Sequence, residues 1–394
     1  MIKELQNVSN HISYGLTVRP EYISEGIPLI SATEIKGGTI DFEAAPKISK
    51  KSFELLSQKA IPKKGDIFFS KTGTIGRVAY VESDEIFAIT QNIAVIRISK
   101  GGYFDKYLLQ YLKTPKLQKQ AISKVNQSTI MDLQLGDIRE LKVPFPKYDE
   151  QTKIANFLTA VDDKISQLTK KHELLTLYKK GVMQKIFSQE LRFKDDDGRE
   201  FAEWDKKKLD EIAILFKGKG ISKADIEKGG AHPCIRYGEL YTEYAEAITK
   251  IQSHTNVDPK KHVLSIENDV IIPASGETQI DIATASCVLV GGVILGGDLN
   301  IIRGSSNQIF NGIFLSYFLN TKKKLEIAKL AQGNSVVHLY TSQLKELVID
   351  LPSTAEQTKI ANFLTAIDDR ITNVKSQLEA AKQYKQGLLQ QMFV

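Results

Sequence analysis

The sequence predicts an α+β protein in which two similar heads, each a small twisted sheet with helices, are joined by two long helices. These helices are expected to pair with each other as a coiled coil. Residues 150–160 and 356–366 both read EQTKIANFLTA, and the likeness continues for 38 positions, of which 20 are identical at a constant offset of 206. Both repeated segments carry a heptad pattern, and a region of short apolar runs precedes each of them.

The first head is predicted to occupy residues 1–148. Short apolar runs at 67–69, 77–81 and 93–98 are separated by polar or glycine-containing stretches, which is typical of β-strands. Helical patterns come later in this region, at residues 104–124. This order of elements predicts a small sheet followed by helices.

The first repeated segment, residues 149–187, is predicted to be one long helix. Its apolar residues recur in steps of four and three, the a/d pattern that places a narrow apolar seam on one side of a helix. Asp149 is expected to cap its start. The seam residues are Ile154, Leu158, Val161, Ile165, Leu168, Leu175, Val182 and Ile186, with His172 and Lys179 at the two remaining positions.

A polar connector, residues 188–203, is expected to lead into the second head, residues 204–352. The second head follows the plan of the first at a weaker level of similarity. Its strand patterns lie at 270–272, 285–290 and 299–302, and its helical pattern lies at 312–331.

The second long helix, residues 353–394, keeps the heptad register of the first. Ser353 and Glu356 fit a capping box at its start. Its seam residues are Ile360, Leu364, Ile367, Ile371, Val374, Leu378, Leu388 and Met392, with Ala381 and Lys385 at the two remaining positions.

A seam two residues wide best suits pairing with one other helix, and the other copy is the natural partner. At a rise of about 1.5 Å per residue, each helix makes a rod of roughly 57 Å. Lys179 and Lys385 are expected to extend their charged heads into solvent. The alternative is two unrelated amphipathic helices, each packed on its own domain. The recurrence of Gln151, Asn156 and Thr159 outside the seam argues against that alternative.

Composition narrows the class of protein. The 394 residues are 42% apolar and 25% charged, the net charge is +6, and the isoelectric point is near 8.9. This balance permits a polyanionic partner without requiring one. No run approaches the roughly 18 apolar residues of a membrane span, the first residues do not resemble a signal peptide, and Cys234 and Cys287 form no spacing motif. A cytoplasmic protein is expected.

Motifs for catalysis or metal binding are missing from the sequence. SKTGTIG at 70–76 lacks the order of a phosphate-binding loop, and GGVILGGD at 291–298 does not fit a dinucleotide-binding fingerprint. The six histidines are scattered without ligand spacing, so no metal site is predicted. The sequence does not support catalysis by this chain alone.

Three segments closely resemble the specificity subunit of type I restriction–modification enzymes. They are LKVPFPKYDEQTKIANFLTAVDDKI (141–165), LVIDLPSTAEQTKIANFLTAIDDRI (347–371) and LRFKDDDGREFAEW (191–204). The resemblance covers the whole chain in the family's order of head, helix, head, helix. One departure is that the first head has no counterpart of Trp204.

The resemblance implies that each head is a target recognition domain that reads one half of a bipartite, asymmetric site in double-stranded DNA. The two long helices would form an antiparallel coiled coil with pseudo-twofold symmetry, which would set the spacing of the two halves. Two modification subunits, which are adenine methyltransferases, would dock on the repeated regions, and restriction subunits would join them in an ATP-dependent endonuclease. S-adenosylmethionine, ATP and magnesium would belong to those partners, and this chain would hold no cofactor.

Candidate DNA contacts lie on loops of both heads. Glutamine and asparagine can bond adenine through two hydrogen bonds, glutamate can accept from cytosine, and threonine can contact the thymine methyl. The alternatives are ordinary turn bonding for Gln91 and Asn92, solvation for Glu277, and capping for the loops that precede the long helices. The candidates are Lys71, Thr72, Gly73, Thr74, Arg77, Gln91, Asn92, Asn126, Gln127 and Ser128 in the first head, and Arg236, Tyr237, Ser275, Gly276, Glu277, Thr278, Gln279, Gln332, Gly333, Asn334 and Ser335 in the second.

Candidate docking residues for the modification subunits recur in both helices outside the seam, with burial against the heads as the alternative. They are Gln151, Asn156, Phe157, Gln357, Asn362 and Phe363. Two other functions stay open at this point, a protein-binding adaptor and a self-sufficient enzyme. Binding to duplex DNA that weakens steeply with salt would favour the DNA-specificity role over the adaptor.

Overall fold

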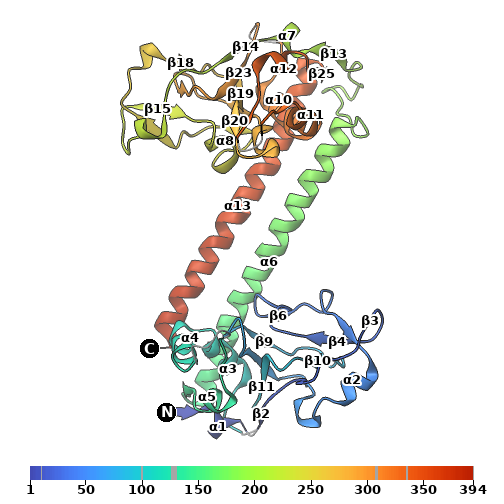
Figure 1. Cartoon of the computed structure of the whole chain (residues 1–394), viewed down its shortest axis with the longest axis vertical. Coiled ribbons are helices and arrows are strands. Elements are labelled where there is room, and N and C mark those ends of the chain that lie inside the picture. The colour runs from blue at the N-terminus through green and yellow to red at the C-terminus, as the bar shows by residue number, and fades with distance from the viewer. Residues whose placement is uncertain (10, 99–100, 126–130, 307–308, 334–335, 394) are drawn as a thin grey trace. The chain divides into compact units, whose positions relative to one another are not determined.

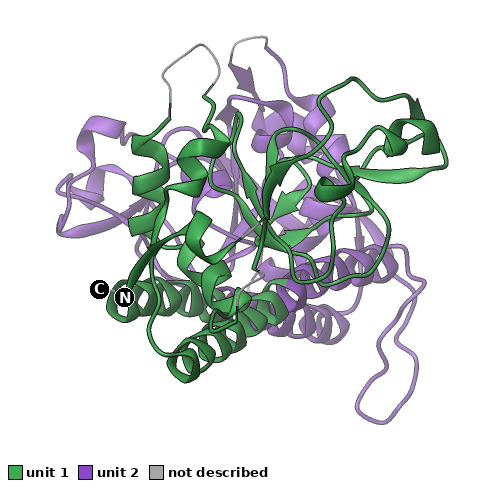
Figure 2. Ribbon diagram, turned by 90° about the horizontal axis from the view of Figure 1, so that it is seen from below, with its two compact units in different colours: residues 1–169, 376–394 green, residues 170–375 purple. Residues whose placement is uncertain are grey.

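The computed structural model describes residues 1–9, 11–98, 101–125, 131–306, 309–333 and 336–393. The chain divides into two compact units, which are coloured separately in Figure 2. Unit 1 consists of residues 1–169 and 376–394, and unit 2 consists of residues 170–375. Each unit therefore contains one head together with segments of both long helices.

The head of unit 1 contains two four-stranded sheets, and Figure 1 labels several of its elements. The main sheet has the order β2-β11-β8-β9 and the second has the order β10-β4-β7-β3. The predicted strands correspond to β8, β9 and β11, but the sequence pattern does not indicate the second sheet. The elements are β1 (Ile2–Glu4), α1 (Leu5–Val8), β2 (His11–Tyr14), β3 (Tyr22–Ile23), β4 (Ile27–Ile30), β5 (Ile35–Lys36), β6 (Thr39–Ile40), β7 (Lys47–Ile48), α2 (Lys50–Glu54), η1 (Gln58–Ala60), β8 (Ile67–Ser70), β9 (Val78–Tyr80), β10 (Ala88–Ile89), β11 (Ile93–Arg97), α3 (Asp105–Leu112), α4 (Pro115–Ser123), α5 (Leu135–Arg139) and β12 (Lys142–Pro144).

The main sheet of unit 1 is buried on both faces because its central strands are apolar at successive positions. Side chains alternate between the faces of a strand, so Ile67 and Phe69 join a core that includes Leu108 of α3. Phe68 points the other way, into a core that it shares with Phe87. The continuous apolar runs in the sequence therefore mark strands covered on both sides.

The head of unit 2 repeats this plan with a five-stranded sheet, β14-β23-β19-β21-β16, and a four-stranded sheet, β17-β15-β22-β18. Its elements are β13 (Asp205–Lys208), α7 (Leu209–Ile212), β14 (Ala213–Lys217), η2 (Lys223–Asp225), β15 (His232–Ile235), α8 (Glu239–Thr242), β16 (Ala247–Ile248), β17 (Ser253–Thr255), η3 (Pro259–Lys261), β18 (Val263–Leu264), β19 (Asp269–Pro273), β20 (Ser275–Gly276), α9 (Gln279–Ile282), β21 (Ser286–Val288), β22 (Ile294–Leu295), β23 (Leu299–Gly304), α10 (Gly312–Thr321), α11 (Lys324–Leu330), β24 (Val337–His338), α12 (Thr341–Lys345) and β25 (Val348–Leu351).

A buried ion pair occupies the same place in both heads. Arg97 at the end of β11 bonds Asp66 at 2.6 Å, and Arg303 of β23 bonds Asp269 of β19 at 2.6 Å. Both carboxylates are fully buried. An arginine can satisfy such a carboxylate with two parallel hydrogen bonds, which offset the cost of removing the charge from water. The two heads are therefore copies of one design.

The long helices are α6 (Tyr148–Phe187) and α13 (Thr354–Met392), and they run antiparallel in each unit. In unit 1, Leu158 shares a core with Phe393, and Asp162, farther along α6, bonds Lys385, which is earlier in α13. Unit 2 shows the same opposed order, because Ile186 shares a core with Ile360 while Lys179 bonds Asp368. This pairing, together with the two α+β heads, confirms the predicted fold class.

Every predicted seam position, His172 and Ala381 included, is buried or half-buried. Two local predictions about these helices are wrong in detail. The α6 helix begins at Tyr148, so Asp149 lies within its first turn and is not the cap. At the start of α13, Ser353 accepts a hydrogen bond from the Glu356 amide, but the Glu356 carboxylate bonds Arg192 and Trp204 instead of completing a capping box.

The seam lysines do not extend into solvent as predicted. Lys385 Nζ lies 2.5 Å from Asp162 Oδ1, and Lys179 Nζ lies 2.7 Å from Asp368 Oδ1. Lys179 also bonds Glu246 at 3.2 Å. Each lysine is held because an aspartate of the opposite helix lies within reach of its ammonium group, and the two pairs are equivalent at the offset of 206.

Candidate nucleic-acid interface

In unit 1, the loop after β8 lies against the chain that follows residue 130. The amide of Leu133 donates to Lys71 O, the amide of Gly73 donates to Met131 O, and the amide of Lys71 donates to Asn92 O. The structure therefore brings the candidate loop at residues 71–74 together with Asn92. The candidates Asn126, Gln127 and Ser128 lie outside the described residues.

In unit 2, the equivalent region contains a short two-stranded β-ladder. Strand β20 pairs with β24, with Ser275 opposite His338 and Gly276 opposite Val337. The hydroxyl of Ser275 also lies 3.2 Å from Asp298 and 3.1 Å from His338 Nδ1. Gln332, which forms an isolated bridge with His338, is exposed at the same edge. The candidates Asn334 and Ser335 lie outside the described residues.

Lys71, a predicted DNA contact, is not available for that role. Its side chain is 11% exposed, and its ammonium group lies 2.7 Å from Asp132 Oδ1. Burial alone would raise the pKa of Asp132, but hydrogen bonds from Lys71 and Thr72 lower it below its usual value. The lysine is therefore neutralised by an internal carboxylate that stays ionised at neutral pH.

Four second-head candidates are also corrected by the structure. Ser275 and Gly276 are buried in the β20–β24 ladder, so neither can reach a base edge. Arg236 Nε lies 3.1 Å from Glu239 Oε1, which is buried, so its charge serves an internal ion pair. Tyr237 is half-buried against the apolar core of the second sheet.

The other described candidates present polar groups at the surface to different extents. Asn92 and Thr72 are half-buried, and Thr72 donates to Asp132. Arg77 is half-buried and donates to Ala32 O at 2.6 Å. Thr278 caps α9 and bonds Asp281, which fixes its hydroxyl. The exposed set is Gly73, Thr74, Gln91, Glu277, Thr278, Gln279, Gln332 and Gly333.

The sequence did not point to two exposed residues that lie at matched positions, at the ends of β2 and β14. Tyr14 and Lys217 are exposed there, and each is followed by a glycine against which another chain segment packs. A Cβ on Gly15 would lie 1.9 Å from Ile89 O, and a Cβ on Gly218 would lie 2.0 Å from Gly296 O. In the sequence, each of these positions can be found as an aromatic or basic residue directly before a glycine at a strand end.

Lys217 lies over an aromatic ring, which makes a mixed basic and aromatic surface in unit 2. Its ammonium group is 5.8 Å from the centroid of Tyr340, which is 46% exposed. Lys219 is exposed nearby in sequence. Cations that contact phosphates and rings that stack on bases are typical of nucleic-acid surfaces.

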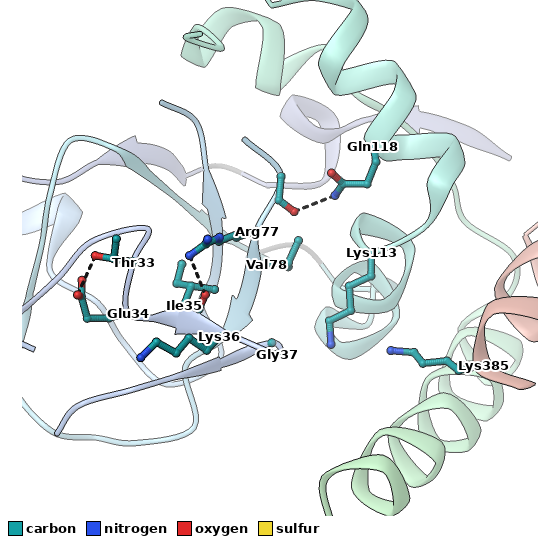
Figure 3. Close-up of a pocket in the computed structure, with 12 residues that line it drawn as sticks. Thr33, Glu34, Ile35, Lys36, Gly37, Arg77, Val78, Lys113, Gln118 and Lys385 are labelled. Carbon is teal, nitrogen blue, oxygen red and sulfur yellow. Dashed lines mark hydrogen bonds between the residues drawn. The ribbon is translucent and has the colours of Figure 1, made fainter. Parts of the chain in front are cut away.

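A cavity of about 820 Å³ in unit 1 is lined by four cations. Figure 3 shows Lys113 and Lys385 pointing toward each other, with Arg77 and Lys36 on the opposite side of the view. Each of these cations has an internal partner, since Lys36 bonds Asp41 while Lys113 and Lys385 share Asp162. Burial lowers the pKa of Lys113, and Asp162 opposes that shift. We therefore assign the cavity no ligand.

Two of the predicted docking residues are engaged by the chain itself. Gln151 is 1% exposed, accepts from the Phe104 amide and donates to Gly102 O. Gln357 is fully buried, accepts from the Asn311 amide and donates to Pro352 O. The docking prediction is wrong for this pair, because each glutamine fastens a long helix to its own head.

The remaining docking candidates differ between the two copies. Asn156 and Asn362 are exposed in both units. Phe157 is 44% exposed, whereas Phe363 is half-buried with its ring centroid 5.4 Å from that of Phe193. The identical helix segments therefore present different surfaces.

The described part of the chain lacks two features of other classes of protein. The described residues contain no group of three or more His, Cys, Asp or Glu side chains placed to hold a metal ion. None of the helices formed by those residues combines the length and apolar character needed to cross a membrane.

Comparison with known proteins gives consistent matches. A family model described as the type I restriction modification DNA specificity domain matches twice, over residues 18–176 and 202–383. One relative is named as the MjaX type I restriction enzyme specificity subunit of Methanocaldococcus jannaschii. It is 28% identical to this chain over 411 residues, and the alignment covers 98% of this chain and 92% of that relative. The MjaIX specificity subunit of the same organism is 22% identical, over 98% of this chain and 90% of its own length.

Among solved structures, the crystal structure of a type I restriction–modification S subunit from M. genitalium matches with a TM-score of 0.66 at 16% sequence identity. The match covers 100% of this chain and 96% of that one. At this identity the likeness shows a shared fold.

Proposed function

The chain belongs to the family of type I restriction modification DNA specificity domains, and from this we propose that it is the DNA sequence-recognition subunit of a type I restriction–modification complex. Residues 1–148 and 204–352 would be two target recognition domains, each reading one half of a bipartite, asymmetric site. The observation that carries this proposal is the doubled family match over two heads whose loops differ while their helices repeat. Two different recognition domains carried by a repeated pair of helices suit an asymmetric site.

Direct reading of bases would fall to exposed polar side chains of the loops. Gln91 in the first head, and Gln279 and Gln332 in the second, can each present an amide to adenine, and Glu277 can accept from the cytosine amino group. Lys217 and Lys219 would contact phosphates, which fix position on the duplex without specifying sequence. The paired long helices would hold the two readers at a set spacing.

The chemistry would belong to other subunits. We assign two modification subunits, which are adenine methyltransferases, to the surfaces of the repeated helices, with restriction subunits joining them in an assembly that acts in the cytoplasm. S-adenosylmethionine, ATP and magnesium would be bound by those subunits. The present chain would supply the choice of site and no catalytic group.

The test is an exchange of one head. Residues 1–148 are replaced by the corresponding head of a relative with a different target, and methylated adenines are mapped across the genome of cells that carry the hybrid and its modification subunit. We expect one half of the site to change while the other half and the gap stay the same. The reciprocal exchange of residues 204–352 is the matched control and should change the other half alone. A hybrid that altered both halves would contradict the assignment of one reader to each head.

A further inference from the structure

One β-branched residue of unit 2 has a backbone conformation that such residues rarely adopt. Among the described residues other than glycine, positive φ angles occur at Gln189 (65°), Ile221 (63°) and Asn268 (76°). Gln189 follows the end of α6, where helices commonly close with a left-handed residue, and asparagine tolerates this region. Ile221 has neither explanation, because a branched side chain is crowded against the backbone at positive φ. Strained residues of this kind cluster at functional sites.

Hydrogen bonds fix the chain on both sides of Ile221. Before it, the amide of Gly297 donates to Gly220 O at 2.7 Å. After it, the amide and the hydroxyl of Ser222 both donate to Asp225 Oδ2 at 2.7 Å. A strained conformation persists only where the surrounding structure determines it in this way.

The side chain of Ile221 is half-buried in a loop whose cations face solvent. Lys217, Lys219 and Lys223 are exposed, and none of them forms an ion pair within the described residues. Duplex DNA offers partners for both kinds of side chain. Its phosphates attract lysines, and the thymine methyl is an apolar group in the major groove.

The head of unit 1 has a matching residue in the equivalent loop. Gly15 and Gly218 occupy equivalent places after β2 and β14, and the third residue after each is Val18 in unit 1 and Ile221 in unit 2. Val18 is 51% exposed and is followed by Arg19, which is also exposed. Both heads therefore place a β-branched apolar side chain next to exposed cations at this position.

In unit 1 this loop contacts the turn that carries a proposed reader of adenine. The amide of Gln91 donates to Leu16 O at 3.0 Å, two residues before Val18. Glutamine reads adenine in the major groove, and the methyl group of the paired thymine lies in the same groove. An apolar side chain beside Gln91 therefore suits the other base of the pair.

We propose that Ile221 and Val18 are specificity-determining residues, each of which contacts the 5-methyl group of a thymine in the major groove of its own half-site. The inference rests on the proposed function and adds two residues to the exposed polar side chains named there. A glycine would adopt the backbone of Ile221 without strain, so the branched side chain serves the contact that it makes.

The test uses the complex of the full chain with its modification subunits, and a labelled duplex that carries the target site mapped from methylated adenines. Each thymine is replaced in turn by uracil, which lacks only the 5-methyl group, and affinity is measured by anisotropy. We expect one position in the second half-site at which uracil weakens binding by about fourfold, the factor for burying one methyl-sized group. Ile221→Gly should weaken binding to the thymine duplex and abolish this uracil effect, because both changes remove the same contact.

Two further variants separate the contact from a change in backbone strain. Ile221→Val keeps a branched side chain and should retain the uracil effect. Gln189→Gly relieves a positive φ outside both heads and is the matched control, with the uracil effect unchanged. Val18→Ala should abolish a uracil effect in the first half-site and leave the second half-site as in the wild type. Circular dichroism should show that all four variants fold.

The outcomes distinguish this inference from the proposed function. A wild-type complex that did not bind the duplex would overturn both. Binding with no sensitivity to uracil in the second half-site, or a uracil effect that persisted in Ile221→Gly, would overturn the assignment of Ile221 alone. A uracil effect in the first half-site that persisted in Val18→Ala would do the same for Val18.

Discussion

Three buried acids, Asp66, Asp269 and Glu356, are each satisfied by an arginine that comes from another part of the chain. Asp66 and Asp269 fasten strand ends inside the two heads, and Glu356 fastens the connector to α13. An ionised carboxylate without such a partner would be strongly unfavourable in the interior. Folding of the connector onto α13 therefore depends on Arg192 and Trp204 arriving together at Glu356.

The two copies of the repeated glutamate give a test at the residue scale. Glu356→Gln removes the buried charge and leaves Arg192 with Glu203, which is 90% exposed, so we expect a loss of about 3 kcal/mol in the free energy of unfolding of unit 2. Glu150→Gln alters the same residue in the same local sequence where it is exposed, and should change stability by less than about 0.5 kcal/mol. Urea unfolding followed by circular dichroism measures both. Equal effects would show that the connector contact does not stabilise the fold.

At the scale of the elements, the two ion pairs between α6 and α13 act as register markers. Asp162 with Lys385 and Lys179 with Asp368 are the same contact made twice, once in each unit. A polar or charged group in an otherwise apolar seam favours the one alignment that satisfies it, because any slip leaves it unpaired. The lysines thus select a single antiparallel register.

Low pH should weaken the ion pair between Asp162 and Lys385 in unit 1. Burial alone would raise the pKa of Asp162, but Lys113, Lys385 and Gln110 together lower it below its usual value. A carboxylate with a lowered folded pKa contributes stability above its unfolded pKa, near 3.9, and that contribution is lost as the pH falls through the folded value. We expect Asp162→Asn to be less stable than the wild type at pH 7 and to show a shallower loss of stability below about pH 4. Asp163→Asn, at an exposed neighbouring position, is the control and should follow the wild type in pH-dependent urea unfolding.

The helices could be predicted from sequence because a heptad pattern is local and repeats many times. The second sheets of the heads could not, because strands such as β3 (Tyr22–Ile23) and β18 (Val263–Leu264) are two residues long and are defined only by distant partners. The same reason explains the errors at the candidate interface. Nothing local to Lys71 indicates that Asp132, 61 residues away, neutralises it, whereas the exposure of Gln91 agrees with its place in a polar turn.

At the scale of the whole molecule, both long helices pass from one unit to the other at equivalent positions. The boundaries between the units fall after Thr169 in α6 and after Lys375 in α13. Each unit keeps its own ion pair, its own core and the end of the helix that comes from the other repeat. An insertion at these boundaries would therefore leave the contacts within each unit intact.

The proposed spacing role makes a quantitative prediction from those boundaries. Inserting one heptad after Thr169 and one after Lys375 preserves the a/d seam of both helices and lengthens the pair by about 10 Å. Because one base pair spans about 3.4 Å of duplex, we expect the gap between the two half-sites to grow by about three base pairs while the half-sites themselves stay the same. Genome-wide mapping of methylated adenines would show both. A heptad inserted in α6 alone is the control, since it shifts one seam against the other and should abolish modification. If the double insertion were active with the original gap, the helices would not set the spacing.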